Sequence, residues 1–244
     1  MIGSTSRSEN PVEIRKTHLR NCAQAEGVVV VIDVLRAFTT TAFAFDRGAS
    51  EILLVSTVED AFEQRERDPD CLLMGEVDGL PIDGFDLPNS PAMIDTLDLR
   101  GRRLVMRTTA GTQGVVLARN AGPLYAAGLG VAAATAREIR RLEPDLVSFV
   151  ETGVRARGGG EEDSACADYI AGLLTGSPPS REGIRRRVSG SRAALKFTDP
   201  NGVDFPRADL RLALQADRFD FAMRVERRDG LAILRPTGGG REPA

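Results

Sequence analysis

The sequence predicts a three-layer α/β/α fold, in which helices cover both faces of a mostly parallel or mixed β-sheet and the chain ends in an antiparallel hairpin. Short, continuously apolar runs recur along the chain, as is typical of strands that are buried on both faces. Segments with helix start and stop signals lie between these runs, so strands and helices alternate. The expected strands are VVVVI (28–32), EILLV (51–55), CLLMG (71–75), RLVMR (103–107), PLYAA (123–127) and LVSFV (146–150).

Capping signals place helices in the intervals between the strands. Thr57 is followed three residues later by Asp60, which is the spacing of a capping box at a helix start. Ser90 precedes Pro91, a residue that favours the first helical turn, and Gly48 follows FAFDR as a helix stop. These signals predict one helix that ends near residue 48 and two that begin near residues 57 and 90.

The C-terminal part of the chain has a different character. After the breaker GSPPS, the segments REGIRRRV and DLRLALQ have helical patterns. Further on, Asp229 and Gly230 lie between two alternating runs in FDFAMRVERRDGLAILRP, which is a hairpin signal. We expect this hairpin to supply an antiparallel edge to the sheet.

The length of 244 residues, without a long linker, favours one compact domain. We expect it to span residues 12–235, between loose polar tails at 1–11 and 236–244. A protein with a formal net charge of −3 lacks the broad basic surface that binds nucleic acids, so we expect no nucleic-acid partner. No apolar run reaches about 18 residues and the N-terminus lacks an apolar signal core, so we expect a cytoplasmic protein without a membrane partner.

Rare residues exclude several classes of enzyme. His18 is the only histidine, so histidine-rich zinc sites and two-histidine phosphoryl chemistry are excluded. Neither of the two lysines lies in a Walker-type loop, which excludes that class of nucleotide triphosphatase. The three cysteines show no C-x-x-C spacing and are expected to be reduced, mostly buried thiols.

Polar residues follow most of the expected strands. Asp33 and Arg36 come after the first strand, Glu76 after the third, and Thr108–Thr112 (TTAGT) after the fourth. Ligands of open α/β sheets bind outside the carboxyl ends of the strands, where these residues lie. Carboxylates hold Mg²⁺, while backbone amides and guanidinium groups hold phosphoryl oxygens, so the pattern indicates a metal-and-phosphate pocket.

Each of these residues also has a structural interpretation. Asp33 is equally well placed to cap the following helix, and Arg36 to form an ordinary salt bridge. The TTAGT segment is also consistent with a simple strand-to-helix connection. Asp163 follows the glycine-rich VRARGGGEED, which indicates either a mobile lid or a capped helix start.

The loop that begins at Glu76 is long and polar. It reads EVDGLPIDGFDLPNSP and includes Asn89 and Ser90 near its end. Loops of this length within compact domains are usually functional, so we expect Glu76 to act as a ligand rather than as surface charge.

Four ordered motifs resemble the 2-phosphosulfolactate phosphatase family: VVIDVLRAFTTT, the GE…GFDLPNSP loop, TTAGT and EDSACA. The resemblance covers residues 28–175. It implies an α/β/α fold and a Mg²⁺-dependent phosphatase that hydrolyses phosphate monoesters of 2-hydroxy acids such as 2-phosphosulfolactate. It further implies a role in coenzyme M biosynthesis, a small anionic phosphate-ester substrate and a homo-oligomer such as a dimer.

The resulting hypothesis assigns Asp33, Glu76 and Asp163 to a Mg²⁺ shell, and Asp33, Arg36 and Asp163 to catalysis. Either Asp33 attacks phosphorus directly or a metal-bound water does; the sequence leaves both open. The residues expected to bind substrate or phosphate are Thr39, Thr40, Asn89, Ser90, Arg107, Thr108, Thr109, Gly111 and Thr112.

Departures from the family pattern motivate a second hypothesis. Val77 and Asp78 stand where the family usually has arginine and glycine, Ala110 replaces an asparagine, and the C-terminal region lacks a histidine. A degenerate member that binds an acidic metabolite or a protein partner without hydrolysis is the alternative. A third hypothesis is a dinucleotide-binding oxidoreductase, because Gly128-x-Gly130-x-x-Ala is followed by Glu151.

Overall fold

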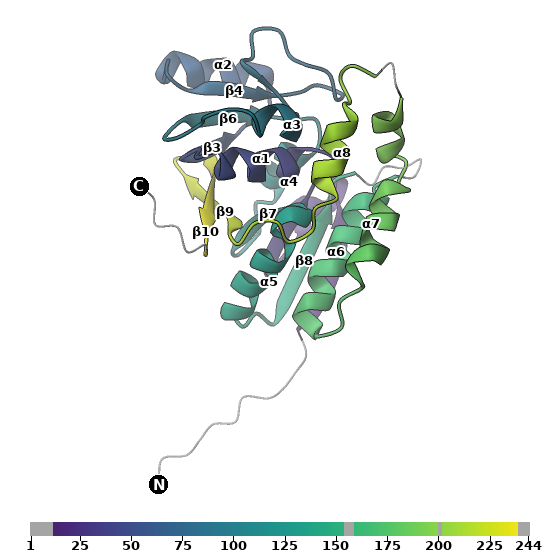
Figure 1. Cartoon of the computed structure of the whole chain (residues 1–244). Helices are drawn as coiled ribbons and strands as arrows, with labels where there is room; N and C mark the ends of the chain where they lie inside the picture. Colours follow the sequence, from purple (N-terminus) through teal and green to yellow (C-terminus); the bar gives the residue numbers. More distant parts are fainter. Residues whose placement is uncertain (1–11, 154–158, 200–201, 239–244) are drawn as a thin grey trace.

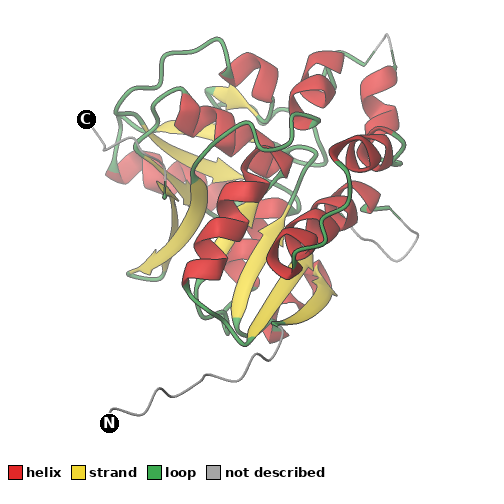
Figure 2. Ribbon diagram, turned by 60° about the horizontal axis from the view of Figure 1, so that its bottom comes forward, coloured by secondary structure: helices red, strands yellow, loops and turns green. Residues whose placement is uncertain are grey.

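The computed structural model describes residues 12–153, 159–199 and 202–238. Helices pack on both faces of one curved sheet, which confirms the predicted α/β/α class (Figures 1 and 2). Within these residues, ten strands follow the order β1-β8-β2-β7-β9-β10-β3-β6-β4-β5. Their bounds are β1 Glu13–His18, β2 Val28–Ile32, β3 Glu51–Leu54, β4 Leu72–Gly75, β5 Leu87–Pro88, β6 Arg103–Arg107, β7 Leu124–Ala127, β8 Leu146–Glu151, β9 Ala222–Arg228 and β10 Leu231–Thr237.

The sheet consists of two parallel blocks joined by the C-terminal hairpin. Strands β1, β8, β2 and β7 form one block, and β3, β6, β4 and β5 form the other. The hairpin strands β9 and β10 pair antiparallel with each other and with the block on either side, so the two blocks run in opposite directions. A flat sheet would place their carboxyl ends at opposite edges, but successive strands twist, and Figure 1 shows β8 of the first block steeply inclined to β4 and β6 of the second.

The hairpin forms as predicted, but it does not lie at the edge of the sheet. Asp229 and Gly230 adopt positive φ values of 52° and 80°, as a two-residue turn requires, so the hairpin itself is confirmed. It lies at the centre of the sheet rather than at its edge, because β9 pairs with β7 and β10 pairs with β3. Strand β10 also continues to Thr237, two residues into the segment expected to be a tail.

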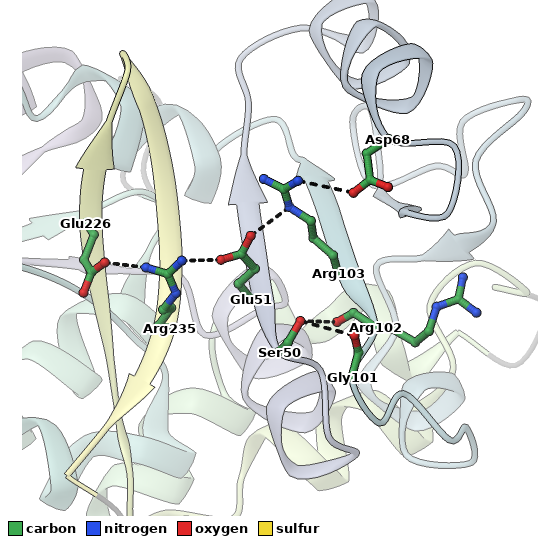
Figure 3. A network of polar contacts seen from close by, with 8 residues as sticks. All are labelled: Ser50, Glu51, Asp68, Gly101, Arg102, Arg103, Glu226 and Arg235. Atoms are coloured by element: carbon green, nitrogen blue, oxygen red, sulfur yellow. Dashed lines mark hydrogen bonds and ion pairs between the residues drawn. The ribbon is translucent and has the colours of Figure 1, made fainter. Parts of the chain in front are cut away.

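An ion-pair network crosses the junction between the hairpin and the second block (Figure 3). Glu51 on β3 forms an ion pair with Arg103 on β6 at 2.8 Å and accepts a hydrogen bond from Arg235 on β10. Arg235 also pairs with Glu226 on β9, and Arg103 pairs with Asp68 at 3.2 Å. Because these side chains are partly exposed, we infer that the network adds little to the free energy of unfolding. Its role is to fix the register of the strands that meet at this junction.

Helix starts follow the predicted signals. Thr57 and Asp60 form a capping box at α2, and Ser90 caps α3 with Pro91 at the first position. The helix α1 ends at Asp46, shortly before Gly48. The remaining bounds are α1 Ala37–Asp46, α2 Val58–Arg67, α3 Pro91–Ile94, α4 Gly111–Leu117, α5 Ala132–Arg141, α6 Glu161–Thr175, α7 Arg181–Ser189 and α8 Arg207–Ala213, with 3-10 helices η1 Leu19–Gln24, η2 Leu129–Val131 and η3 Ala194–Thr198.

The core forms where the continuously apolar strands face helices on both sides. Every residue of β2 and β7 is buried, and so are the three cysteines, which are free thiols as predicted.

The strand β1 was not predicted, because EIRKTH is an edge strand with exposed polar side chains. Within the described residues, no helix has the length and apolar character that crossing a bilayer requires.

Candidate active site

Asp33 lies directly after β2, and its side chain is buried. Its Oδ1 accepts a hydrogen bond from the Ala37 amide at 3.0 Å, so it does cap α1. Burial raises the pKa of Asp33 to about 7, and the negative charges of Glu76 and Glu162 act in the same direction. Amides donate to the carboxylate from Ala37 and Gly111, and they lower the pKa in part. Asp33 therefore combines a capping role with the perturbed titration typical of functional carboxylates.

Asp163 approaches Asp33 from the first turn of α6. Its Oδ1 accepts from the amide of Val34 at 2.8 Å, and its Oδ2 accepts from the amide of Gly153 at 2.7 Å. Burial raises its pKa well above the usual value, and the charges of Asp33 and Glu162 add to this. The donors to both aspartates are thus backbone amides, supplemented at Asp163 by the Thr152 hydroxyl at 3.4 Å.

Glu162 is a third buried carboxylate beside Asp33 and Asp163, and the sequence analysis did not predict it. It lies beside Asp163 on α6, is 3% exposed, and has an Oε2 without a hydrogen-bond partner among the described residues. Burial raises its pKa as well. Its signal is the acidic GGGEED segment, in which Glu162 directly precedes Asp163. We call Asp33, Glu162 and Asp163 the carboxylate cluster.

The TTAGT turn meets the carboxylate cluster from the other parallel block. A Cβ atom on Gly111, the first residue of α4, would lie 2.7 Å from the Cβ of Ala37 and 2.8 Å from Oδ2 of Asp33. Only glycine permits this approach, because both distances are shorter than side-chain packing allows. The predicted convergence of Asp33 with the threonine turn is therefore present, although their strands belong to oppositely directed blocks.

Replacing Gly111 by alanine is expected to lower the free energy of unfolding by about 1–3 kcal/mol, because the added methyl group must displace Ala37 and Asp33. The midpoint of urea unfolding measures this change. Gly183→Ala on α7 is the matched control, because the new Cβ would meet only the Ser180 hydroxyl at 3.1 Å. Equal stability of the two variants would contradict the close approach.

Glu76 follows β4, and its carboxylate accepts hydrogen bonds from the turn that it begins and from the threonine turn. Its Oε1 accepts from the Thr109 amide at 2.7 Å, and its Oε2 accepts from the Thr109 hydroxyl at 3.1 Å and from the Gly79 amide. The Thr109 hydroxyl in turn accepts from the Asp78 amide at 2.7 Å. Glu76 is thus joined to the threonine turn, and its charge reaches Asp33, but its oxygens are used to fix the start of the long loop.

Arg36 does not have the free guanidinium that the hypothesis requires. Its Nη1 donates to Oδ2 of Asp209 at 2.9 Å and to the carbonyl of Asp204 at 2.8 Å, while Nη2 donates to the carbonyl of Gly79 at 3.1 Å. The group also lies over the rings of Phe197 and Phe205. The prediction that Arg36 holds phosphoryl oxygens therefore needs correction: the guanidinium ties together three segments of the chain.

Four of the predicted threonines serve the backbone. Thr39 donates to the carbonyl of Val34 at 2.7 Å, and Thr40 donates to the carbonyl of Arg36 at 3.1 Å. Both hydroxyls therefore stabilise α1 rather than point to a ligand. Thr108 and Thr112 form a reciprocal pair, in which each hydroxyl accepts from the other's amide, at 2.9 and 3.1 Å. This pair fixes the turn that carries Thr109 and Gly111.

The remaining predicted residues lie near Glu76. Arg107, at the end of β6, donates to the carbonyl of Glu76 at 2.9 Å. Asn89 and Ser90 line a cavity that Glu76 also lines. Ser90 donates to Oδ1 of Asp209 at 2.7 Å. Asp209 is a fully buried carboxylate on α8 that sequence analysis missed, because no local pattern distinguishes it within the amphipathic DLRLALQ.

The donor chemistry of the carboxylate cluster fits a divalent cation. Buried carboxylates that raise one another's pKa carry uncompensated negative charge, and Mg²⁺ is commonly held by one or two carboxylates with water and substrate phosphate. Asp33 and Asp163 would provide these ligands. Within the described ranges, no three histidine, cysteine or acidic side chains are grouped to hold a metal ion. The predicted shell of Asp33, Glu76 and Asp163 is thus not assembled.

The raised pKa of Asp33 predicts a stability that falls as pH rises. In the metal-free chain the folded state holds the Asp33 proton up to about pH 7, whereas the unfolded chain releases it near its usual pKa of about 3.9. The folded state therefore binds more protons between these values, and stability is lost as pH increases through them. Between pH 5 and pH 8 we expect a loss of about 2–3 kcal/mol, measured by urea unfolding in a chelator. Equal unfolding free energies at the two pH values would contradict the shift.

The dinucleotide-binding hypothesis does not fit the geometry. A Cβ on Gly130 would lie 3.2 Å from the Phe219 ring, and one on Gly128 would lie 3.1 Å from the Thr39 hydroxyl, so side chains of the protein already cover both glycines. An amide in the first turn of the following helix α5 is also occupied, because Ala133 donates to Oδ1 of Asp217 at 2.9 Å. A pyrophosphate would need this space and these donors.

Fold and site together define an α/β/α protein with a buried acidic site where the carboxyl ends of two parallel blocks meet. The family model for 2-phosphosulpholactate phosphatase matches residues 14–199. The chain therefore belongs to the 2-phosphosulfolactate phosphatase family, which confirms the resemblance.

Curated relatives agree with this assignment. A probable 2-phosphosulfolactate phosphatase of Bacillus subtilis is 36% identical over 218 residues, which cover 88% of this chain and 94% of the relative. Proteins of the same description are 37% identical in Symbiobacterium thermophilum, over 78% of this chain and 84% of the relative, and 41% identical in Deinococcus radiodurans, over 60% and 62%.

Proposed function

We propose that this protein is a phosphatase that hydrolyses phosphate monoesters of 2-hydroxy acids, such as 2-phosphosulfolactate, with Mg²⁺ as its cofactor. The carboxylate cluster carries the proposal, because it gathers buried negative charge beside the threonine turn in a chain of this phosphatase family. When bound, Mg²⁺ would offset the charge of the phosphoryl group and lower the pKa of a bound water.

The chain's own residues supply orientation and proton control. Gly111 keeps the threonine turn against Asp33, so that the turn and the cluster face the same reacting group. The pKa of Asp33, near 7 in the metal-free chain, allows this carboxyl group to hold or release a proton at neutral pH. Asp163 fixes the position of Asp33 through the Val34 amide.

Phosphate release is the direct test. We expect Mg²⁺-dependent release of phosphate from 2-phosphosulfolactate and from other 2-phospho-2-hydroxy acids, and loss of that release in a chelator. Binding of the esters without release, at every Mg²⁺ concentration, would instead support the non-catalytic alternative that Val77 and Ala110 motivate.

The two possible nucleophiles, Asp33 and a water molecule, differ in whether a covalent intermediate forms on the protein. If Asp33 attacks phosphorus, the ester bond to the 2-hydroxy acid breaks and an aspartyl phosphate remains on the protein. If a water attacks, the phosphate leaves directly and the protein stays unmodified. Hydroxylamine trapping during turnover, followed by mass measurement of the Asp33 peptide, distinguishes the two.

We also propose a homo-oligomer, tested by sedimentation equilibrium, and a role in coenzyme M biosynthesis, tested by restoring that pathway in a strain without its phosphatase. Family membership supports both proposals. A monomer at micromolar concentration would contradict the first, and failure of an active enzyme to restore the pathway would contradict the second.

A further inference from the structure

Glu151 is a buried carboxylate that the proposed mechanism does not use. It ends β8, is 3% exposed, and lies beside Ile32 in the parallel pairing of β8 with β2. Ile32 directly precedes Asp33, so Glu151 stands at the strand ends that carry the carboxylate cluster. Because the dinucleotide-binding hypothesis does not fit the geometry, this acidic side chain has no function assigned to it.

Glu151 binds the first turn of α6 directly. Its Oε2 accepts a hydrogen bond from the Ser164 hydroxyl at 2.6 Å. Ser164 immediately follows Asp163, whose carboxylate accepts from the Val34 amide at 2.8 Å. A hydrogen bond of this length from a hydroxyl to a carboxylate is among the stronger kinds found in proteins. The contact between Glu151 and Ser164 therefore fixes the turn that carries Asp163.

A second connection from Glu151 to α6 runs through Lys16 on β1. The Nζ of Lys16 lies 3.6 Å from Oε1 of Glu151, and it also pairs with Asp168 on α6. Ser164 and Asp168 are four residues apart, so they lie on the same face of the helix. Glu151 thus reaches two successive turns of α6, one directly and one through Lys16.

The start of α6 depends on such contacts, because no side chain caps it. The helix begins after Gly160, which has a left-handed φ of 83° and makes no side-chain cap. Outside the carboxylate cluster, two hydrogen bonds between described residues tie the first turn to other segments. They join Ser164 to Glu151 at 2.6 Å and the Arg192 amide to Glu161 at 3.3 Å. The first is the shorter, so we expect its loss to leave the turn less firmly placed.

A buried carboxylate is a costly way to hold two elements together. The Oε1 of Glu151 makes no hydrogen bond to the described residues, and its ion pair with Lys16 is long. Buried ion pairs are often replaced by apolar side chains of similar volume without loss of stability. An apolar side chain cannot supply a directional acceptor for Ser164, however. Glu151 therefore contributes placement of the helix rather than packing against it.

We infer that Glu151 is a positioning residue of the candidate active site. Through Ser164 it holds the first turn of α6 in place, so that the Asp163 carboxylate stays next to that of Asp33, in the arrangement that binds Mg²⁺. Contacts that orient metal ligands in this way set the metal affinity, and their loss weakens binding about tenfold or more. The inference rests on the proposed function, because it takes the carboxylate cluster as the Mg²⁺ site.

Two variants remove the same hydrogen bond from its two ends. Ser164→Ala and Glu151→Leu are each expected to weaken Mg²⁺ binding about tenfold, measured by titration calorimetry of the metal-free protein without substrate. Alanine has the highest helix propensity, so we expect Ser164→Ala to fold. The double variant is expected to add little to either single change, because both break one contact. Glu151→Gln keeps an oxygen that accepts from Ser164, so we expect its affinity to stay within about threefold of the wild type.

Glu51→Leu is the matched control. Glu51 is also a carboxylate of the sheet, but it begins β3 and pairs with Arg103 and Arg235 rather than with α6 (Figure 3). Its loss is expected to leave the Mg²⁺ affinity unchanged, even where the free energy of unfolding falls. If Ser164→Ala and Glu151→Leu behave like this control, Glu151 serves stability alone and the inference is overturned.

Phosphate release from 2-phosphosulfolactate separates the inference from the proposed function. Because Glu151 acts through the metal, we expect Ser164→Ala to need about tenfold more Mg²⁺ for half of its maximal rate, with kcat at saturating Mg²⁺ within about threefold of the wild type. Release with an unchanged Mg²⁺ requirement overturns the inference and leaves the proposed function intact.

The opposite failure is equally visible. If the variants bind Mg²⁺ more weakly than a wild type that hydrolyses no ester, the proposed function fails and the inference stands. A wild-type protein that binds no Mg²⁺ overturns the inference, and phosphate release in a chelator then tests hydrolysis separately.

Discussion

Asp33→Asn is expected to lower kcat by about a thousandfold, because the amide cannot carry the charge or the proton that phosphoryl transfer needs at this position. The amide oxygen still accepts from the Ala37 amide, so α1 keeps its cap. Steady-state phosphate release at saturating substrate and Mg²⁺ measures the effect.

The same substitution is expected to stabilise the metal-free protein. Asp33 carries its charge in a buried position near Glu76 and Glu162, and an uncharged side chain removes both the burial cost and the repulsion. We expect a gain of about 1–2 kcal/mol at pH 8, of the kind found when strained functional groups are replaced. A purely structural cap would instead leave kcat unchanged, because the asparagine oxygen keeps the hydrogen bond from the Ala37 amide.

Asp98→Asn is the matched control. Asp98 is exposed and pairs with Arg100, so its loss is expected to change kcat and the unfolding free energy little. If Asp33→Asn keeps the turnover of the wild type, the carboxylate cluster is not the site of the reaction.

The sequence predicted the fold well where a local pattern determines the structure. Continuously apolar runs gave the strands β2, β3, β4, β6, β7 and β8, and the capping pairs gave the starts of α2 and α3. The two-residue edge strand β5 was not predicted. Strand order is not a local property. The hairpin lies at the centre because β7 and β3 both offer free edges, and nothing within residues 219–236 indicates which edges it joins.

The candidate site was predicted only in part, again because a sequence pattern reports local structure and not which distant segments meet. Asp33, Asp163 and the threonine turn lie in recognisable strand-end or helix-start positions, and the structure brings them together. The role of Arg36 depends on Asp209, which lies 173 residues further along the chain. No pattern near either residue reveals that pair, so the sequence alone could not show that the guanidinium is occupied.

Asp209→Ala is expected to destabilise the protein by about 3–5 kcal/mol, the usual cost of leaving one member of a buried ion pair without its partner. Asp209 is fully buried and accepts from Arg36 at 2.9 Å, from the Ser90 hydroxyl at 2.7 Å and from the Ala92 amide at 3.0 Å. Its removal leaves all three donors without this acceptor. Urea unfolding at pH 7 measures the loss.

A double-mutant cycle with Arg36→Met isolates the pair. Each single change leaves a buried charge unpaired, whereas the double variant removes both charges, so we expect the two effects to be non-additive by about 2 kcal/mol or more. Arg181→Met and Asp217→Ala form the comparison cycle, because Arg181 is 61% exposed where it pairs with Asp217 at 2.7 Å, and its coupling should stay below about 1 kcal/mol. Additive effects at Arg36 and Asp209 would mean that water or another group satisfies the guanidinium. The ring contact between Phe197 and Phe205, rather than the ion pair, would then hold η3 to the segment before α8.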